Sequence, residues 1–137
     1  MPQPVDPRVL GVTVAGGAIG VFARALVVAP VDDPAAVPWV TLGINVAGSL
    51  ILGIVVGWLD DRSPLARAFL GTGIMGGFTT YSAFAVATAL WVTTPWLAVG
   101  LAAASVVAGV GGALAGLFLG RRISDRPGAI ELPEDAE

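Results

Sequence analysis

The chain has 137 residues, of which 55% are apolar, only 12% are charged and 19 are glycine, and its formal net charge is −3. This composition is too hydrophobic for a soluble domain of this length and indicates an all-α integral membrane protein in the lipid bilayer. The sequence contains no cysteine and no histidine, which excludes disulfides, thiolate catalysis and most transition-metal sites.

The first predicted span covers residues 9–29 and ends before Pro30. Arg24 lies about one turn inside its end. An arginine at this depth either extends its side chain to the membrane surface, as an anchor, or faces an aqueous vestibule. The sequence leaves both interpretations open.

The second predicted span covers residues 39–59, and polar side chains follow one face of it. Thr41, Asn45 and Ser49 are spaced four residues apart. For Thr41 or Ser49 alone, a hydrogen bond to a neighbouring helix is the better interpretation. An amide such as Asn45 is costlier to leave unpaired in lipid, so it needs a partner, water or an ion. We therefore predict a functional role for Asn45.

The third predicted span covers residues 68–91, which carry no charge and are numerous enough to cross a bilayer. Near its centre, Gly76, Gly77, Thr79 and Thr80 are poor helix formers. We therefore expect the helix to break at the membrane midplane. Irregular backbone at that depth is tolerated only where it is buried in protein or lines a cavity, so the break indicates a functional site.

The fourth predicted span covers residues 96–120 and is rich in small residues. Gly112, Gly116 and Gly120 recur every four residues, which is typical of closely packed membrane helices. We expect the same packing role for three shorter pairs: Gly16/Gly20, Gly53/Gly57 and Gly73/Gly77. Residues 1–121 are thus predicted to form one four-helix transmembrane domain, and 122–137 a polar tail that is disordered beyond its first turn.

The arginines predict the orientation of the chain. Four spans place both termini on one side, and that side carries most of the arginines: Arg8, Arg62, Arg67, Arg121, Arg122 and Arg126. Because cytoplasmic loops are enriched in Lys and Arg, we expect cytoplasmic N- and C-termini in the cell (plasma) membrane.

The sequence also excludes several functional classes. It contains no metalloprotease, serine-hydrolase or P-loop motif and no basic surface for nucleic acid, so we predict neither an enzyme nor a nucleic-acid-binding protein. A small coupled transporter is a weaker alternative, because it would need an acidic residue inside a span. Hydroxyls, one amide and aromatic rings remain, and these suit a passive ion channel.

Three motifs resemble the CrcB/Fluc fluoride channel family: GGAIGVFAR in the first span, WVTLGINVAGSLILG in the second and GIMGGFTTYSAF in the third. The resemblance implies a fluoride-specific channel subunit that exports the fluoride ion passively from the cytoplasm. It also implies an antiparallel dimer with a structural sodium ion at its centre.

The resemblance further implies individual roles. The backbone carbonyls of Gly76 and Thr79 are expected to hold sodium, and Asn45 to donate to fluoride. Tyr81 and Phe84 would contribute ring edges, Ser82 would belong to the polar lining, and Arg24 matches the first-span arginine of the family. Further residues are expected as possible polar lining: Thr41, Ser49 and Thr80.

The chain departs from the family pattern in its third span. Tyr81 stands where Phe is usual, Ala83 where Thr is usual and Ala87 where an acidic residue is usual. Together with the arginine bias, these departures predict a dimer with an oppositely oriented paralogue rather than with a second copy. A pore-inactive structural subunit of such a heterodimer is the alternative.

Overall fold

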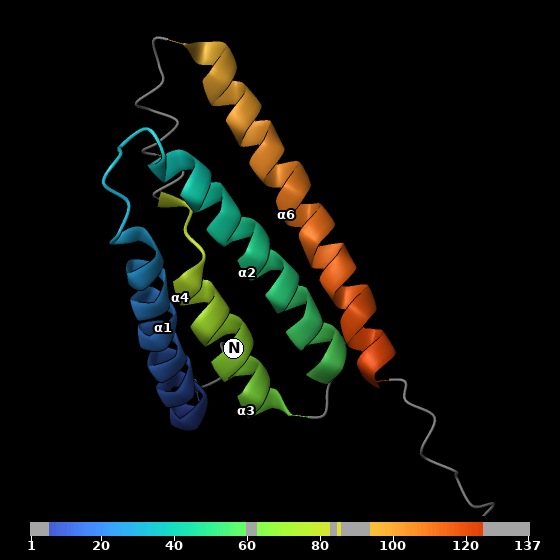
Figure 1. Cartoon of the computed structure of the whole chain (residues 1–137). Coiled ribbons are helices and arrows are strands. Elements are labelled where there is room, and N and C mark those ends of the chain that lie inside the picture. The colour runs from blue at the N-terminus through green and yellow to red at the C-terminus, as the bar shows by residue number, and fades with distance from the viewer. Residues whose placement is uncertain (1–5, 60–62, 83–84, 86–93, 125–137) are drawn as a thin grey trace, which may run out of the picture.

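The computed structural model describes residues 6–59, 63–82, 85 and 94–124. Its three long helices are α1 (Pro7–Val28), α2 (Val37–Leu59) and α6 (Pro95–Ser124), and all three are long and apolar enough to cross a membrane (Figure 1). Their bounds differ from the predicted spans 9–29, 39–59 and 96–120 by four residues or fewer. Residues 125–137 of the predicted tail lie outside the described residues.

Short polar side chains shape the start of α1 and the turn before α2. Asp6 precedes α1, and its carboxylate accepts the backbone N–H of Arg8 at 2.8 Å, with Pro7 as the first helical residue. In the turn before α2, the Asp33 carboxylate accepts the backbone N–H of Ala35 at 2.9 Å. Both contacts satisfy N–H groups that have no helical acceptor.

The third apolar segment is a continuous helical run of unusual geometry. It consists of α3 (Pro64–Arg67), the π-helix η1 (Ala68–Met75) and α4 (Gly76–Phe78). The chain leaves the helix at Thr79, whose backbone is extended with φ −75° and ψ 156°. The predicted span 68–91 continues into residues 83–84 and 86–93, which lie outside the described residues. The four-span count and the broken third helix therefore stay predictions.

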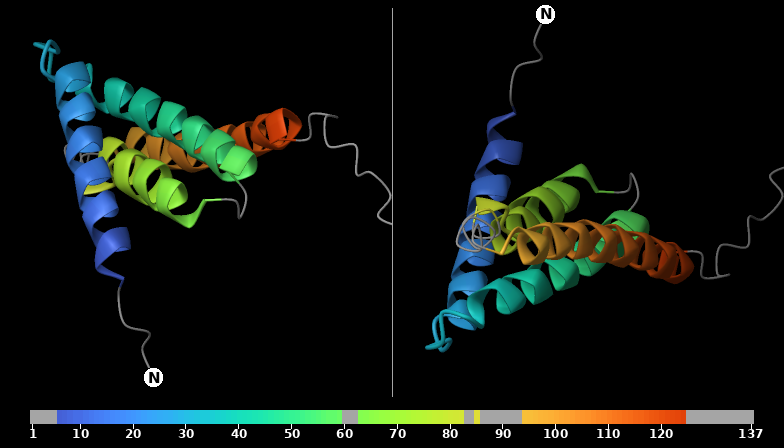
Figure 2. Two further views of the ribbon diagram at one scale, coloured as in Figure 1. Left: turned by 90° about the horizontal axis from the view of Figure 1, so that it is seen from below. Right: turned by 90° about the horizontal axis from the view of Figure 1, so that it is seen from above.

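Helices that follow one another in the sequence run in opposite directions, and they contact one another in the order α1, third segment, α2 and α6 (Figure 1). α2 lies between α6 and the third segment, and α1 packs on the other side of η1 and α4 (Figures 1 and 2). Contacts between α1 and α2 are few, so η1 and α4 form the link between these two helices. This arrangement places the end of α4 between α1 and α2.

Glycines allow the backbones of neighbouring helices to touch. Between α2 and α6, a β-carbon on Gly53 would overlap the Ala113 carbonyl, and one on Gly116 would overlap the Leu50 carbonyl. Between α1 and the third segment, Gly20 lies against the Ile74 carbonyl in the same way. The predicted packing role of the glycine stripes is confirmed, because these contacts leave no room for a side chain.

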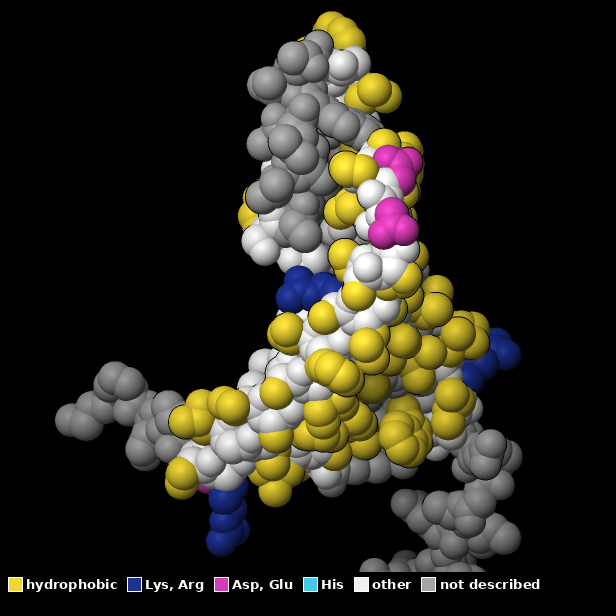
Figure 3. All heavy atoms as spheres, turned by 60° about the vertical axis from the view of Figure 1, so that its left-hand side comes forward, with side chains coloured by type: hydrophobic (Ala, Val, Ile, Leu, Met, Phe, Trp, Pro, Cys, Tyr) yellow, Lys and Arg dark blue, Asp and Glu magenta, His cyan; other side chains and the backbone are white. Residues whose placement is uncertain are grey.

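The outer surface of the molecule is apolar. Figure 3 shows hydrophobic side chains over much of one face, and single residues such as Phe22, Val106 and Leu114 are more than 60% exposed. Trp39, Trp58 and Trp96 lie exposed near helix ends, where tryptophan favours the membrane interface. Soluble proteins rarely expose so much contiguous apolar surface. Together with the three long apolar helices, this surface identifies a membrane protein.

Candidate functional site

Asn45 joins the middle of α2 to the extended backbone that follows α4. Its Nδ2 donates to the Thr80 carbonyl at 3.0 Å, and its Oδ1 accepts the Thr80 N–H at 2.8 Å. The backbone fixes the orientation of the amide, because a flipped amide would place donor against donor and acceptor against acceptor. The two bonds use one of the two Nδ2–H groups, so the amide retains a second donor.

Thr79 occupies the turn between the end of α4 and Thr80. Its N–H and its hydroxyl both donate to the Met75 carbonyl, each at 2.9 Å. Its methyl group lies where a β-carbon on Gly48 of α2 would stand. Gly48 is three residues after Asn45, so the same face of α2 binds Thr80 and accommodates Thr79.

We expect Gly48→Ala to displace Thr79 and to destabilise the fold. The new methyl group overlaps the Thr79 methyl and comes within 3.4 Å of the Phe78 ring, while the hydroxyl bond to Met75 opposes rotation of Thr79. Overpacking of this kind costs about 1–3 kcal/mol. The measurement is the thermal unfolding midpoint of the detergent-solubilised protein.

The matched control for this substitution is Gly43→Ala. Gly43 lies on the same helix, and no atom lies within 4 Å of the point that its β-carbon would occupy, so alanine should be tolerated there. Equal midpoints for the two variants would contradict the close fit of Thr79 against Gly48.

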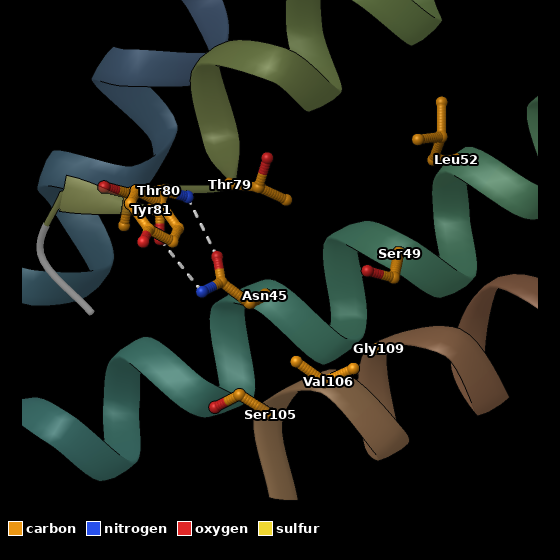
Figure 4. Close-up of a pocket in the computed structure, with 9 residues that line it drawn as sticks. All are labelled: Asn45, Ser49, Leu52, Thr79, Thr80, Tyr81, Ser105, Val106 and Gly109. Carbon is orange, nitrogen blue, oxygen red and sulfur yellow. Dashed lines mark hydrogen bonds between the residues drawn. The ribbon is translucent and has the colours of Figure 1, made fainter. Parts of the chain in front are cut away.

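A pocket of about 300 Å³ opens beside the Asn45–Thr80 contact. Figure 4 shows that its walls come from α2, the extended segment and α6. Five of its residues were predicted from the sequence as site residues: Asn45, Ser49, Thr79, Thr80 and Tyr81. Four were not: Leu52, Ser105, Val106 and Gly109. The lining formed by the described residues is therefore apolar with a few hydroxyl and amide groups, and none of these residues is charged.

Ser105 is the functional candidate that the sequence reasoning missed. Its hydroxyl oxygen is buried, and within the described residues it has no hydrogen-bond partner. A buried hydroxyl that makes no hydrogen bond destabilises the folded protein, unless a ligand or a water molecule bonds to it. The available signal was its isolation, since Ser105 is the sole hydroxyl residue between positions 96 and 120.

A second pocket, of about 270 Å³, lies between α1 and α2. It contains three residues predicted as site residues, Arg24, Thr41 and Thr80, among apolar side chains. Arg24 is half-buried, and Thr41 is 2% exposed. Thr80 lines both pockets. The extended segment therefore lies between the first pocket, which contains Asn45, and the second pocket, which contains Arg24.

The remaining predicted residues lie around the same segment. The Ser82 and Thr80 hydroxyls are 3.3 Å apart, and the Tyr81 side chain is 82% exposed. Gly76 is exposed, and no atom of the described residues lies within 4 Å of the place where a β-carbon would stand. Phe84, Ala83 and Ala87 lie outside the described residues. Within the described ranges, no group of three His, Cys, Asp or Glu side chains lies close enough to bind a metal ion. The oxygen ligands that this segment can provide are backbone carbonyls and hydroxyls.

The part of the chain that forms these helices and pockets is similar in sequence to known proteins. Residues 12–120 match the sequence pattern of the family described as "CrcB-like protein, Camphor Resistance (CrcB)". This match covers α2, the third segment, both pockets and all but the outer ends of α1 and α6. The chain belongs to this family. The resemblance drawn from the three motifs is thereby confirmed.

Curated relatives carry a more specific name. A protein of Novosphingobium aromaticivorans named "Fluoride-specific ion channel FluC" is 44% identical over 117 residues, which cover 80% of this chain and 93% of that protein. A protein of Leifsonia xyli named "Fluoride-specific ion channel FluC 2" is 41% identical over 121 residues, covering 82% and 83% respectively. These are ion channels and not enzymes, which agrees with the prediction of a non-enzyme.

Proposed function

We propose that the chain is a fluoride-specific ion channel subunit through which fluoride leaves the cytoplasm passively. The observation that carries this proposal is the buried Ser105 hydroxyl, which has no hydrogen-bond partner among the described residues, in a pocket whose described lining is uncharged and also contains the Asn45 amide. Fluoride is small and strongly hydrated, so a pathway must replace its water with hydrogen-bond donors. Neutral donors in an apolar wall can do this without holding the anion too tightly to leave.

Individual roles follow from the chemistry of the lining. Asn45, with its second N–H, and the Ser49 and Ser105 hydroxyls are the donors of the first pocket. The positive edges of aromatic rings assist where lone pairs would repel an anion, and we assign this role to Tyr81 and Phe84. Ser82 extends the polar lining.

Arg24 serves the second pocket. A positive side chain in a hollow with low-dielectric walls raises the local concentration of anions. Because Thr80 lines both hollows, we place Arg24 in a vestibule that leads toward the donors, with Thr41 beside it. This proposal takes the vestibule rather than the anchor interpretation of Arg24.

Sodium has a structural role in this proposal, and the residues present fit such an ion. A hard monovalent cation prefers oxygen ligands, and the last turn of a helix leaves carbonyls without helical donors. α4 ends at Phe78, and Gly76 within it is exposed with open space beside it. We assign the carbonyls of Gly76 and Thr79 to the ion.

The assembly that we propose is an antiparallel dimer in the plasma membrane. Each subunit has four spans with a broken third helix, and both termini of this chain are cytoplasmic because its arginines gather on that side. An antiparallel pair has its two-fold axis in the membrane plane, so segments that end near mid-depth can meet there. The arginine bias and the departures at Tyr81, Ala83 and Ala87 favour an oppositely oriented paralogue as the partner.

Fluoride efflux from loaded vesicles tests the proposal. Vesicles that contain the functional assembly are expected to release fluoride rapidly when a potassium ionophore balances the charge, and to retain chloride under the same conditions. The measurement is the initial rate recorded with a fluoride-selective electrode. Efflux that requires a proton gradient would instead support the coupled transporter.

The same assay distinguishes the forms of the assembly. The chain is reconstituted alone and together with its paralogue, and cross-linking reports the orientation of the subunits. We expect efflux from the pair. Full efflux and an antiparallel dimer from the chain by itself would rule out an obligate partner. Normal efflux from a pair whose Asn45 is replaced by leucine in this chain would support the pore-inactive alternative.

A further inference from the structure

The hydrogen bonds at the end of α4 are distributed unevenly. In a continuing α-helix, the Thr80 N–H would donate to the carbonyl of Gly76, four residues earlier. In this structure that N–H donates to Asn45 Oδ1 at 2.8 Å. One residue earlier, the Met75 carbonyl receives both the N–H and the hydroxyl of Thr79. The Asn45 amide thus takes the donor that would otherwise close the next turn on Gly76.

We infer that Asn45 is a positioning residue that exposes the Gly76 carbonyl to the cation, in addition to its role toward fluoride. This inference rests on the proposed sodium site. The second bond, from Nδ2 to the Thr80 carbonyl at 3.0 Å, keeps Thr80 extended and so fixes the neighbouring Thr79 carbonyl. One amide in the wall of the anion pocket therefore shapes the cation site and couples the two.

The surroundings of Gly76 agree with this role. Gly76 is exposed, and among the described residues no atom lies within 4 Å of the place where its β-carbon would stand, so their side chains do not crowd this turn. Thr80 is 8% exposed, so its N–H cannot simply be satisfied by solvent. Without an acceptor at position 45, the cheapest partner for the buried N–H is the Gly76 carbonyl, and that bond would remove the oxygen from the cation.

Two substitutions at position 45 separate positioning from fluoride donation. Asn45→Leu removes both bonds at similar size. Asn45→Asp retains an oxygen that accepts the Thr80 N–H but removes both N–H groups, and with them the bond to the Thr80 carbonyl and the donor for fluoride. The matched control is Ser49→Ala, one turn further along α2, which lines the same pocket but makes no bond to Thr80.

The experiment measures the thermal unfolding midpoint of the purified functional assembly against sodium concentration, with N-methylglucamine as the replacement cation at constant ionic strength. Fluoride efflux is measured in parallel. We expect Asn45→Leu to raise the half-saturating sodium concentration roughly tenfold or more, since a ligand to a charged group is lost. Ser49→Ala should retain the wild-type sodium response. Asn45→Asp should fall between the wild type and Asn45→Leu, because it keeps an acceptor for the Thr80 N–H but loses the bond to the Thr80 carbonyl. Efflux falls in both variants.

The outcomes separate this inference from the proposed function. A wild-type half-saturating concentration in Asn45→Leu would overturn the positioning role and leave the channel proposal standing. If Asn45→Leu does not fold, Asn45→Asp decides, because complete loss of its sodium response would show that an acceptor for the Thr80 N–H does not keep the Gly76 carbonyl available, which would overturn the role equally. A wild-type assembly that conducts fluoride but shows no response to sodium would overturn both the sodium site and this inference.

Discussion

Gly116→Ala is expected to separate α2 from α6 and to leave little folded protein. The β-carbon would overlap the Leu50 carbonyl oxygen and would lie 2.9 Å from the Ile54 nitrogen, so only movement of whole backbones can relieve the contact. The cost should reach the upper part of the range for overpacking, about 3 kcal/mol. It is measured as a lower thermal midpoint in detergent and a smaller monodisperse fraction in size-exclusion chromatography.

Gly111→Ala on the same helix is the matched control. Gly111 is exposed, and a β-carbon added to it would meet no atom within 4 Å. Alanine favours the helix over glycine by about 1 kcal/mol, so this variant should be as stable as the wild type or slightly more stable. Wild-type behaviour of Gly116→Ala would show that α2 and α6 are not held at backbone contact.

Ser105→Ala should slow fluoride efflux strongly while leaving the fold intact. Removing a hydrogen bond to an ion costs about 1.5–3 kcal/mol, which corresponds to a fall of roughly tenfold to a hundredfold in rate. The substitution also removes a buried hydroxyl that has no partner within the described residues, so the thermal midpoint should stay equal or rise. Efflux rate and midpoint, measured on the same preparation, should therefore move in different directions.

Val107→Ala is the control for this loss of function. Val107 lies on α6 two residues further on and is 71% exposed, so its truncation should leave the efflux rate unchanged. Ser105→Thr, which retains a hydroxyl, should recover part of the rate. Wild-type efflux from Ser105→Ala would show that this hydroxyl does not face the ion, and it would remove the observation that carries the proposed function.

The long helices could be predicted closely because the physical signal for them is strong. Long apolar runs bounded by prolines and arginines place α1, α2 and α6 within a few residues. The point where the third segment leaves the helix was harder to predict. Propensity pointed to the stretch that contains Gly76, Gly77, Thr79 and Thr80 without locating the end of the helix within it. The two glycines are helical, because Gly77 packs directly on the backbone of Gly17 and tertiary contact outweighs propensity. The extended backbone begins at Thr79.

Five of the nine residues given for the first pocket could be predicted from the sequence, but the bonds between them could not. The cost of an unpaired amide in lipid identified Asn45, but its partner Thr80 is 35 residues away in the chain. Only the packing of the third segment against α2 brings the two together. Ser105 gave a weak signal, since a single serine in a membrane helix commonly bonds to its own backbone and needs no ligand.

The π-helix η1 contacts α2 on one side and α1 on the other. A π-helix has more residues per turn than an α-helix, so each residue turns the chain through a smaller angle about the helix axis. The directions in which all later side chains and the exit of the helix point are shifted accordingly. Gly71 faces Leu52 of α2, whereas Gly73 faces Gly16 of α1. The direction in which Thr79 and Thr80 leave the helix is therefore determined earlier in the chain, by the number of residues in η1 (Ala68–Met75). A residue inserted or deleted there would redirect the extended segment without altering any side chain in it.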